Sequence, residues 1–288
     1  MLSFDWSLDG DRFVTGYSDG RVCLWSNSQG AQHRLNHTNG PVNVVKICPN
    51  SDYIITGGND RSINVWNMDG TINTSFKSHD ATINDLEWIS GEEFASGGND
   101  ENIHIYKIGV PEPIRIISGH SGSILSIKYD RNSNQLASLA EDETLRTWSV
   151  FGATQRYGFK IAPQSACFSW NPKGFFLAYA SQQAVKYFDT NSGDFECELK
   201  GHHAVVRSLA FSPDGAFLAT GDARGTIFVW CLRTFEIVVG FQREIQPAIG
   251  AITKIDWNFD GTIIAATTST GLSILLDVSN FVGNMMLH

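Results

Sequence analysis

A serine at the centre of Gly16-Tyr17-Ser18-Asp19-Gly20 gives the chain a formal match to G-x-S-x-G, the nucleophile elbow of hydrolases. In that elbow, a sharp turn between a strand and a helix exposes the serine for attack on an acyl carbon. Here the β-forming run RVCLW follows the serine, and the equivalent positions of two other repeats read GGND. We therefore interpret Ser18 as a turn residue and predict that the chain is not an enzyme.

Metal binding is a second kind of chemistry to weigh, because two histidines are adjacent at His202-His203. Adjacent residues of a strand point to opposite faces, and no acidic or cysteine cluster lies beside this pair in the sequence. Asp9-Gly10-Asp11 lacks the further ligands of a calcium loop and is typical of a hairpin turn. The five cysteines, at positions 23, 48, 167, 197 and 231, include no C-x-x-C pair. Their odd number and scattered spacing argue against a zinc site or a disulfide framework and favour a reducing compartment. We predict no metal.

Composition argues against several further function classes. The chain has 288 residues and a net charge of −9, without the concentrated cationic face that direct nucleic-acid binding usually needs. No apolar run approaches the ~20 residues that span a bilayer, and residues 1–8 lack the basic start and apolar stretch of a secretory signal. No glycine-rich phosphate loop precedes a helix. We expect protein partners, and no nucleic acid, membrane, cofactor or small-molecule substrate.

Seven short alternating runs of β-forming residues recur along the whole chain. Each run ends on an anchor residue, and successive anchors are 41, 40, 42, 40, 42 and 46 residues apart. A period of about 40–45 residues is typical of a β-propeller, in which each repeat forms one four-stranded blade. The pattern predicts a single all-β domain over residues 1–288 with seven blades. The anchors are Trp25, Trp66, Tyr106, Trp148, Phe188, Trp230 and Leu276.

Polar residues recur at fixed distances before these anchors. A turn position lies six residues before the anchor, and in five repeats a hydroxyl lies four residues before that turn. The turn position holds Asp19, Asp60, Asp100 and Asp142, but Arg224 and Thr270 in two later repeats. The hydroxyls belong to Thr15, Thr56, Ser96, Ser138 and Thr220. Turn sequences such as SPDG follow the preceding strand and predict hairpins.

These residues resemble the WD40 family, whose repeats carry a G-H…W-D signature. The resemblance implies one buried hydrogen-bond chain per blade, formed by a histidine, the strand hydroxyl, the turn aspartate and the tryptophan. Such a chain pins its turn, because buried polar groups are costly unless they are paired. Complete sets are expected at His37–Thr56–Asp60–Trp66 and His120–Ser138–Asp142–Trp148. The set His79–Ser96–Asp100 ends on Tyr106, and the set His202–Thr220 is expected to lack its aspartate.

Several segments are similar to one WD40 branch, the transducin-beta-like corepressor subunits of histone deacetylase complexes. They include VTGYSDGRVCLW, FASGGNDENIHIYKIG and LASLAEDETLRTWSV, and the last repeat ends in Leu-Leu-Asp in place of Trp-Asp. The resemblance implies eight blades, preceded by an oligomerising helical module that docks the corepressor. Because the chain has seven repeats and begins near Trp6, we expect an eight-blade member without its first blade and that module. The tail 280–288 is expected either to supply the outer strand of the last blade or to leave the ring incomplete.

The resemblance also places partner contacts on the face that carries the turn aspartates, and loops on a rigid scaffold are where binding concentrates. Acidic groups on these loops favour a basic partner such as a histone tail. We predict a non-catalytic scaffold in the nucleus, a subunit of a transcriptional corepressor complex that binds corepressor and deacetylase subunits. The candidate contacts are Tyr17, Asn59, Asp80, Asn99, Glu141 and His203.

Alternative functions stay open at this point. One is a substrate receptor of a ubiquitin ligase, although Cys231 replaces the aspartate of the W-D-x-R adaptor box in Trp230-Cys231-Leu232-Arg233. Another is a different scaffold in the cytoplasm. A third is a hydrolase that acts through Ser18.

Overall fold

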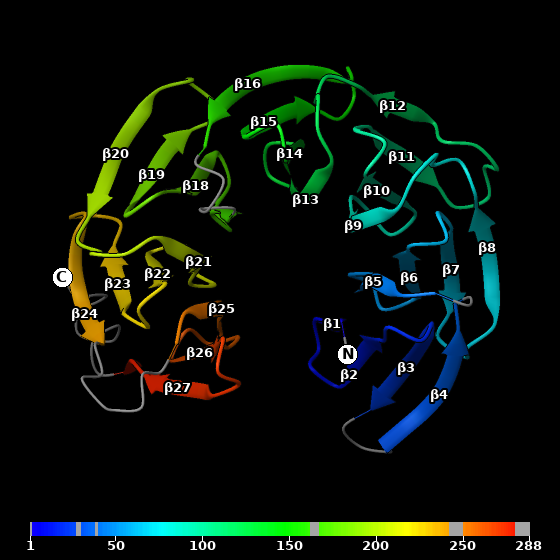
Figure 1. The fold of residues 1–288 in the computed structure, drawn as a ribbon, viewed down its shortest axis with the longest axis horizontal. Helices are drawn as coiled ribbons and strands as arrows, with labels where there is room; N and C mark the ends of the chain where they lie inside the picture. The colour runs from blue at the N-terminus through cyan, green and yellow to red at the C-terminus, as the bar shows by residue number, and fades with distance from the viewer. Residues whose placement is uncertain (1, 27–29, 38–39, 162–166, 242–249, 280–288) are drawn as a thin grey trace. The chain divides into compact units, whose positions relative to one another are not determined.

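The computed structural model describes residues 2–26, 30–37, 40–161, 167–241 and 250–279, in which all 27 assigned elements are β-strands. Six antiparallel sheets have four strands, and a seventh has three (Figure 1). The chain divides into two compact units. The N-terminal unit comprises residues 1–129 and 135–159, and the C-terminal unit comprises residues 130–134 and 160–288.

The N-terminal unit contains the first four sheets, apart from the turn at residues 130–134. Their strands are β1 (Ser3–Trp6), β2 (Arg12–Gly16), β3 (Arg21–Ser26) and β4 (Gly30–Asn36); β5 (Val42–Ile47), β6 (Tyr53–Gly58), β7 (Ile63–Asn67) and β8 (Ile72–Phe76); β9 (Ile83–Trp88), β10 (Glu93–Gly98), β11 (Ile103–Lys107) and β12 (Arg115–Ile117); and β13 (Ile124–Asp130), β14 (Gln135–Ala140), β15 (Thr144–Ser149) and β16 (Thr154–Lys160).

The C-terminal unit contains the other three sheets. Their strands are β17 (Phe168–Trp170), β18 (Phe176–Ser181), β19 (Ala184–Asp189) and β20 (Phe195–Lys200); β21 (Val206–Phe211), β22 (Phe217–Asp222), β23 (Ile227–Cys231) and β24 (Glu236–Phe241); and β25 (Ile252–Trp257), β26 (Ile263–Thr268) and β27 (Ser273–Asp277). Within each sheet, strands that follow one another in the sequence are also neighbours in space, as in a β-meander.

Within a unit, neighbouring sheets meet through their first strands and pack apolar side chains between them. β1 contacts β5, and β5 contacts β9; in the C-terminal unit, β17 contacts β21, and β21 contacts β25. The anchor residues end or nearly end the third strand of each sheet. Trp66, for example, packs in a cluster with Val42 and Val45 of the first strand, whereas the side chains on the outermost strands are more exposed. The apolar packing therefore places one hairpin turn between the second and third strands of each sheet.

Paired glycines set the geometry of that turn in two blades. A Cβ at Gly58 would lie 2.2 Å from the Pro41 carbonyl oxygen, and a Cβ at Gly98 would lie 2.3 Å from the Thr82 carbonyl oxygen. Only glycine permits such a close approach. In the second sheet it brings the β6–β7 turn against the segment before β5. In the third sheet it brings the β10–β11 turn against the segment before β9. The sequence GGND thus brings the turn residues next to the loop that carries the histidine.

The predicted fold class is confirmed, with seven sheets whose third strands carry the seven anchors. The last sheet has three strands among the described residues. The tail 280–288, to which we assigned an outer strand as one possibility, lies outside the described residues. Among the described residues, no helix has the length and apolar character that crossing a bilayer requires.

Candidate binding surface and the networks beneath it

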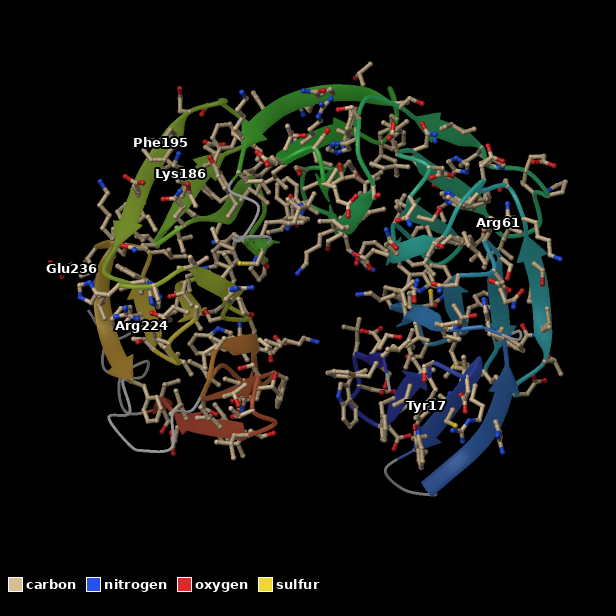
Figure 2. All side chains as sticks on the ribbon, in the orientation of Figure 1. Tyr17, Arg61, Lys186, Phe195, Arg224 and Glu236 are labelled. Atoms are coloured by element: carbon tan, nitrogen blue, oxygen red, sulfur yellow. The ribbon has the colours of Figure 1, made fainter. Side chains whose placement is uncertain are left out.

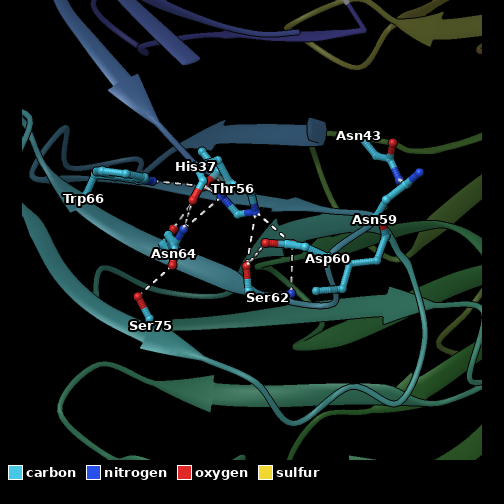
Figure 3. A network of polar contacts seen from close by, with 10 residues as sticks. His37, Asn43, Thr56, Asn59, Asp60, Ser62, Asn64, Trp66 and Ser75 are labelled. Carbon is cyan, nitrogen blue, oxygen red and sulfur yellow. Dashed lines mark hydrogen bonds and ion pairs between the residues drawn. The ribbon is translucent and has the colours of Figure 1, made fainter. Parts of the chain in front are cut away.

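The second sheet brings His37, Thr56, Asp60 and Trp66 together in one buried network (Figure 3). Trp66 Nε1–H donates to Thr56 Oγ1 at 2.9 Å, and the same hydroxyl lies 2.7 Å from His37 Nδ1. The other ring nitrogen, Nε2, lies 3.3 Å from Asp60 Oδ1. Ser62 closes the network by donating to Asp60 Oδ2 at 2.7 Å. This set joins the loop before β5 to the turn between β6 and β7.

The fourth sheet repeats the arrangement and adds an arginine that pairs with the carboxylate. His120 Nε2 lies 2.7 Å from Ser138 Oγ, and His120 Nδ1 lies 2.9 Å from Asp142 Oδ2. Trp148 Nε1–H donates to Ser138 Oγ at 2.7 Å. Arg146 adds an ion pair to Asp142 at 3.4 Å. Asp142 is half-buried with its side chain 5% exposed, and both of its carboxylate oxygens accept hydrogen bonds.

The sixth sheet corrects the expectation that the His202–Thr220 set lacks an aspartate. His202 Nδ1 lies 3.0 Å from Asp222 Oδ2, and His202 Nε2 lies 2.7 Å from Thr220 Oγ1. Asp222 lies at the start of the turn, two residues before the position that carries aspartate in other blades, where this blade has Arg224. The expectation was wrong because it tied the carboxylate to one position, whereas either end of a tight turn can present a carboxylate to the histidine.

The third sheet ends its network on a tyrosine, as expected, and adds a second histidine. His79 Nδ1 lies 2.6 Å from Asp100 Oδ2, and His79 Nε2 contacts Ser96 Oγ. His104 stacks on His79 with ring centroids 4.0 Å apart, and its Nδ1 lies 3.1 Å from the Tyr106 hydroxyl. Burial and the neighbouring His79 lower the pKa of His104 to about 4.

His104 marks a position that sequence reasoning missed, two residues before each anchor. In the pairing of the second and third strands, this residue is opposite the residue that carries the strand hydroxyl. It therefore lies next to the structural histidine. Asn64 Nδ2 lies 3.0 Å from His37 Nδ1, and Phe228 packs on His202 with ring centroids 4.6 Å apart. The face of this residue could be predicted, because side chains two apart on a strand share a face, but its contact with the histidine could not.

The first sheet places Tyr17 in a structural role. Its hydroxyl lies 3.4 Å from Thr15 Oγ1, which also accepts a hydrogen bond from Trp25 Nε1–H at 2.9 Å. The Arg21 guanidinium lies over its ring, 5.1 Å from the centroid. Tyr17 is half-buried and belongs to the internal network as much as to the surface.

Three of the other predicted contact residues are exposed, and each accepts a hydrogen bond from a residue in or next to the first strand of its own sheet. Asn59 Oδ1 accepts from Asn43 Nδ2 at 2.9 Å, and Asn99 Oδ1 accepts from Asn84 Nδ2 at 2.7 Å. Glu141 accepts a hydrogen bond from a serine in the same way. Asn43 Nδ2 and Asn84 Nδ2 also donate to the Ile83 and Ile124 carbonyls of the next sheet, at 2.9 and 2.7 Å. The turns therefore form a pre-ordered surface.

We call this surface the turn rim: the turns at residues 17–20, 58–61, 98–101 and 140–143 together with Asp80, all in the N-terminal unit. Figure 2 labels Tyr17 and Arg61, which belong to two of these turns. Arg61 donates to the Asp80 carbonyl oxygen at 3.2 Å. Asp80, Glu101 and Glu143 are exposed, and within the described residues their carboxylates form no ion pair. Glu101 and Glu143 occupy positive-φ positions, at 66° and 60°. The rim therefore exposes three carboxylates that form no ion pair within the described residues, next to the exposed Arg61.

The remaining candidates lie apart from this surface. His203 is exposed in the C-terminal unit, whereas its neighbour His202 is buried, so the two histidines do not form a metal site together. Ser18 is an exposed turn residue between strands β2 and β3, without the helix that a nucleophile elbow requires.

Asp142 gives a test of the buried networks by pH. Burial opposes its charge, but hydrogen bonds from Thr144, His120 and the Ser121 backbone outweigh burial and lower its pKa to about 2. A carboxyl with a lowered folded-state pKa stabilises the fold above its ordinary pKa near 3.8 and loses that contribution as the pH falls towards 2. We expect Asp142 ionisation to contribute about 2 kcal/mol at neutral pH.

Urea unfolding of the wild type and Asp142→Asn at pH 7 and pH 3 measures this contribution. The difference in unfolding free energy between the two proteins should narrow at pH 3. An equal difference at both pH values would show that the carboxylate is not charged and hydrogen-bonded as described.

The WD40 family model (WD domain, G-beta repeat) matches residues 1–26, 31–67, 70–107, 111–149 and 193–231. Among curated proteins, the chain is 28% identical over 290 residues to F-box-like/WD repeat-containing protein TBL1X of Mus musculus, which covers 96% of this chain and 54% of that protein. It is 29% identical to WD40 repeat-containing protein HOS15 of Arabidopsis thaliana, over 96% of this chain and 46% of that protein. The chain thus spans about half the length of the curated relatives it matches.

Among solved structures, the C-terminal WD40 domain of Sif2 superimposes with a TM-score of 0.83 at 23% identity, covering 95% of this chain and 80% of that one. Repeated sheets, buried histidine networks and these matches together define a propeller of the kind that mediates protein–protein interactions. The chain belongs to the WD40 family, and its relatives include transducin-beta-like WD repeat proteins.

Proposed function

We propose that the chain is a scaffold subunit of a nuclear corepressor complex that contains histone deacetylase, and that its turn rim binds a basic segment of a partner. The similarity to transducin-beta-like proteins along 96% of the chain supports the first part. The exposed rim carboxylates, which form no ion pair in the part of the chain that the structure describes, support the second part, because complementary charge steers and orients protein association.

The partner segment proposed for the rim is an unstructured lysine- and arginine-rich tail of the kind that histones carry. Asp80, Glu101, Glu141 and Glu143 offer it exposed acceptors on turns whose backbones are already fixed. A pre-ordered surface avoids part of the entropic cost of binding, so the flexible tail alone has to become ordered. The outward amides of Asn59 and Asn99 can donate to the tail's backbone carbonyls.

Charge reversal on the rim tests this proposal. We expect the double variant Asp80→Lys/Glu141→Lys to bind an unmodified histone-tail peptide at least about tenfold more weakly than the wild type. The wild-type affinity should also fall as salt rises from 50 to 300 mM, since exposed charges are screened. Fluorescence anisotropy of a labelled peptide measures both effects.

Glu112→Lys is the matched control, because Glu112 is exposed in the loop between β11 and β12, at the other end of β11 from the rim. It should bind the peptide as the wild type does. Equal affinity of the double variant and the wild type would contradict a role for the rim. The complex itself is tested separately by affinity purification from native cells, in which a deacetylase subunit should co-purify.

A substrate receptor of a ubiquitin ligase is the second candidate. It is favoured by the end of β23, where Cys231, Leu232 and Arg233 line a cavity of about 800 Å³ in the C-terminal unit. Arg233 is exposed there. A cullin adaptor that co-purifies with the wild type and is lost with Arg233→Ala would favour this function over the corepressor subunit.

A further inference from the structure

A cavity of about 800 Å³ lies between the fifth and sixth sheets, and the histidine networks do not use its lining. The turns between the first and second strands of both sheets contribute to it, together with the turn between β23 and β24. The turns of the turn rim are of another kind, since they join second strands to third strands. A cavity of this volume is in the range of clefts that bind ligands, and it is larger than any single side chain.

Aromatic rings form one wall of the cavity. The Phe176 and Tyr187 rings stack with their centroids 5.0 Å apart, and the Phe235 ring centroid lies 6.1 Å from that of Tyr187. Tyr187 is 5% exposed, and its hydroxyl accepts a hydrogen bond from Asn171 Nδ2 at 3.2 Å. Among the residues that the structure describes, the hydroxyl proton has no acceptor. The wall therefore combines apolar ring surface with one unused hydrogen-bond donor.

Phe235 occupies a backbone conformation that favours glycine. Its φ is 59°, and its N–H donates to the Cys231 carbonyl oxygen as the N–H of Gly193 donates to that of Asp189 in the fifth sheet. A bulky residue at positive φ is uncommon, and such strain is concentrated at functional sites. The Phe235 side chain is nevertheless 37% exposed, so burial does not explain why phenylalanine stands there. The corresponding turns of three other sheets have glycine at positive φ: Gly70, Gly109 and Gly193.

The charged groups of the lining favour an acidic ligand. Lys173 of the fifth sheet and Arg233 of the sixth are exposed, and within the described ranges neither forms an ion pair. Asp214 accepts two hydrogen bonds from groups of its own turn. Glu196 is the other carboxylate of the lining. Two cations therefore stand against one carboxylate that its own turn does not use.

We propose that this cavity binds a short acidic peptide segment of a partner protein. An aromatic side chain of the segment packs against Tyr187 and Phe235, and a neighbouring carboxylate pairs with Arg233. The Tyr187 hydroxyl donates to a backbone carbonyl of the segment, which gives its proton an acceptor. The pair between carboxylate and guanidinium adds a charge-assisted hydrogen bond. The segment has the opposite charge from the one proposed for the turn rim, so the two sites bind different segments.

The first experiment selects a displayed library of random short peptides on the wild type and removes the sequences that also bind Phe235→Gly. The remaining sequences should be enriched in an aromatic residue next to aspartate or glutamate. Because the variant places glycine in a conformation that suits it, its urea midpoint should equal or exceed that of the wild type. The proposal is overturned if no sequence distinguishes the two proteins, if basic sequences are enriched, or if the midpoint of the variant is lower.

The second experiment measures the affinity of the most enriched peptide by fluorescence anisotropy. Arg233→Glu should weaken binding at least about tenfold, since repulsion replaces an attractive charge pair. Exchange of the aromatic residue of the peptide for alanine should weaken it at least as much. Arg207→Glu is the matched control, because Arg207 is exposed on β21 of the same sheet and does not line the cavity. Unchanged affinity of Arg233→Glu or of the alanine peptide would refute the proposal, whatever the result for the histone tail at the turn rim.

Discussion

Replacing Asp222 by alanine is expected to lower the free energy of unfolding by about 3–5 kcal/mol, the usual result of leaving buried partners of a charged group unpaired. The Asp222 side chain is 1% exposed. It accepts hydrogen bonds from the backbone N–H groups of Arg224 and Thr226, both at 2.9 Å, and contacts His202 Nδ1. Alanine removes all three partnerships at once, and no water replaces them in a site this enclosed.

Asp189→Ala is the matched control in the C-terminal unit. Asp189 also accepts backbone N–H groups, from Asn191 at 2.7 Å and Ser192 at 3.3 Å, but its turn is exposed to solvent. Water can satisfy those donors, so the loss should be about 1 kcal/mol. Chemical denaturation measures both variants. A loss of less than 1 kcal/mol for Asp222→Ala would mean that the carboxylate does not hold the turn.

Replacing Phe94 by alanine is the second large change, with an expected loss of about 3–5 kcal/mol. Phe94 is fully buried between three aromatic rings. The ring centroids of Phe76, Trp88 and Tyr106 lie 5.8, 5.5 and 5.2 Å away from that of Phe94. Tyr106 takes the place of the usual tryptophan, so this blade depends on the whole aromatic cluster, and alanine leaves a cavity that the rigid sheets cannot fill.

Phe94→Leu separates the cavity from a general sensitivity of the site. Leucine keeps much of the apolar volume, and its cost should be clearly smaller, roughly 1–2 kcal/mol. Equal losses for alanine and leucine would show that ring geometry, and not filled volume, stabilises the cluster. Urea titration of both variants in parallel is sufficient.

The periodic part of the molecule could be predicted from the sequence. The anchors follow one period because each must fill the same space between neighbouring sheets, and the His37 and His120 sets follow because their spacing is shared by the repeats. Asn43 and Asn84, one repeat apart, carried the same kind of signal, although it was not used. These residues were accessible because equivalent positions have equivalent surroundings.

The features that escaped prediction are those in which one blade differs from the others. Asp222 acts from a different turn position, Tyr17 supplies a hydroxyl from within a turn, and His104 becomes a neighbour of His79 only through the pairing of β10 with β11. Such contacts depend on which side chain takes the place of the residue usual at that position of the blade. The repeat period and the residue types do not specify which side chain this is.

The residue two positions before each anchor has a consequence for how the chain avoids misfolding. Sheets of the same length and register are candidates to exchange hairpins during folding, a recognised hazard of repetitive chains. Asn64, His104 and Phe228 each contact the histidine of their own blade, and Arg146 pairs with the turn aspartate that contacts the histidine of its blade. A hairpin inserted in the wrong blade would bring the wrong partner to that histidine and leave buried polar groups unpaired. Variation at this position therefore makes each hairpin fit its own blade better than the other blades. A chain of identical repeats would lack this preference.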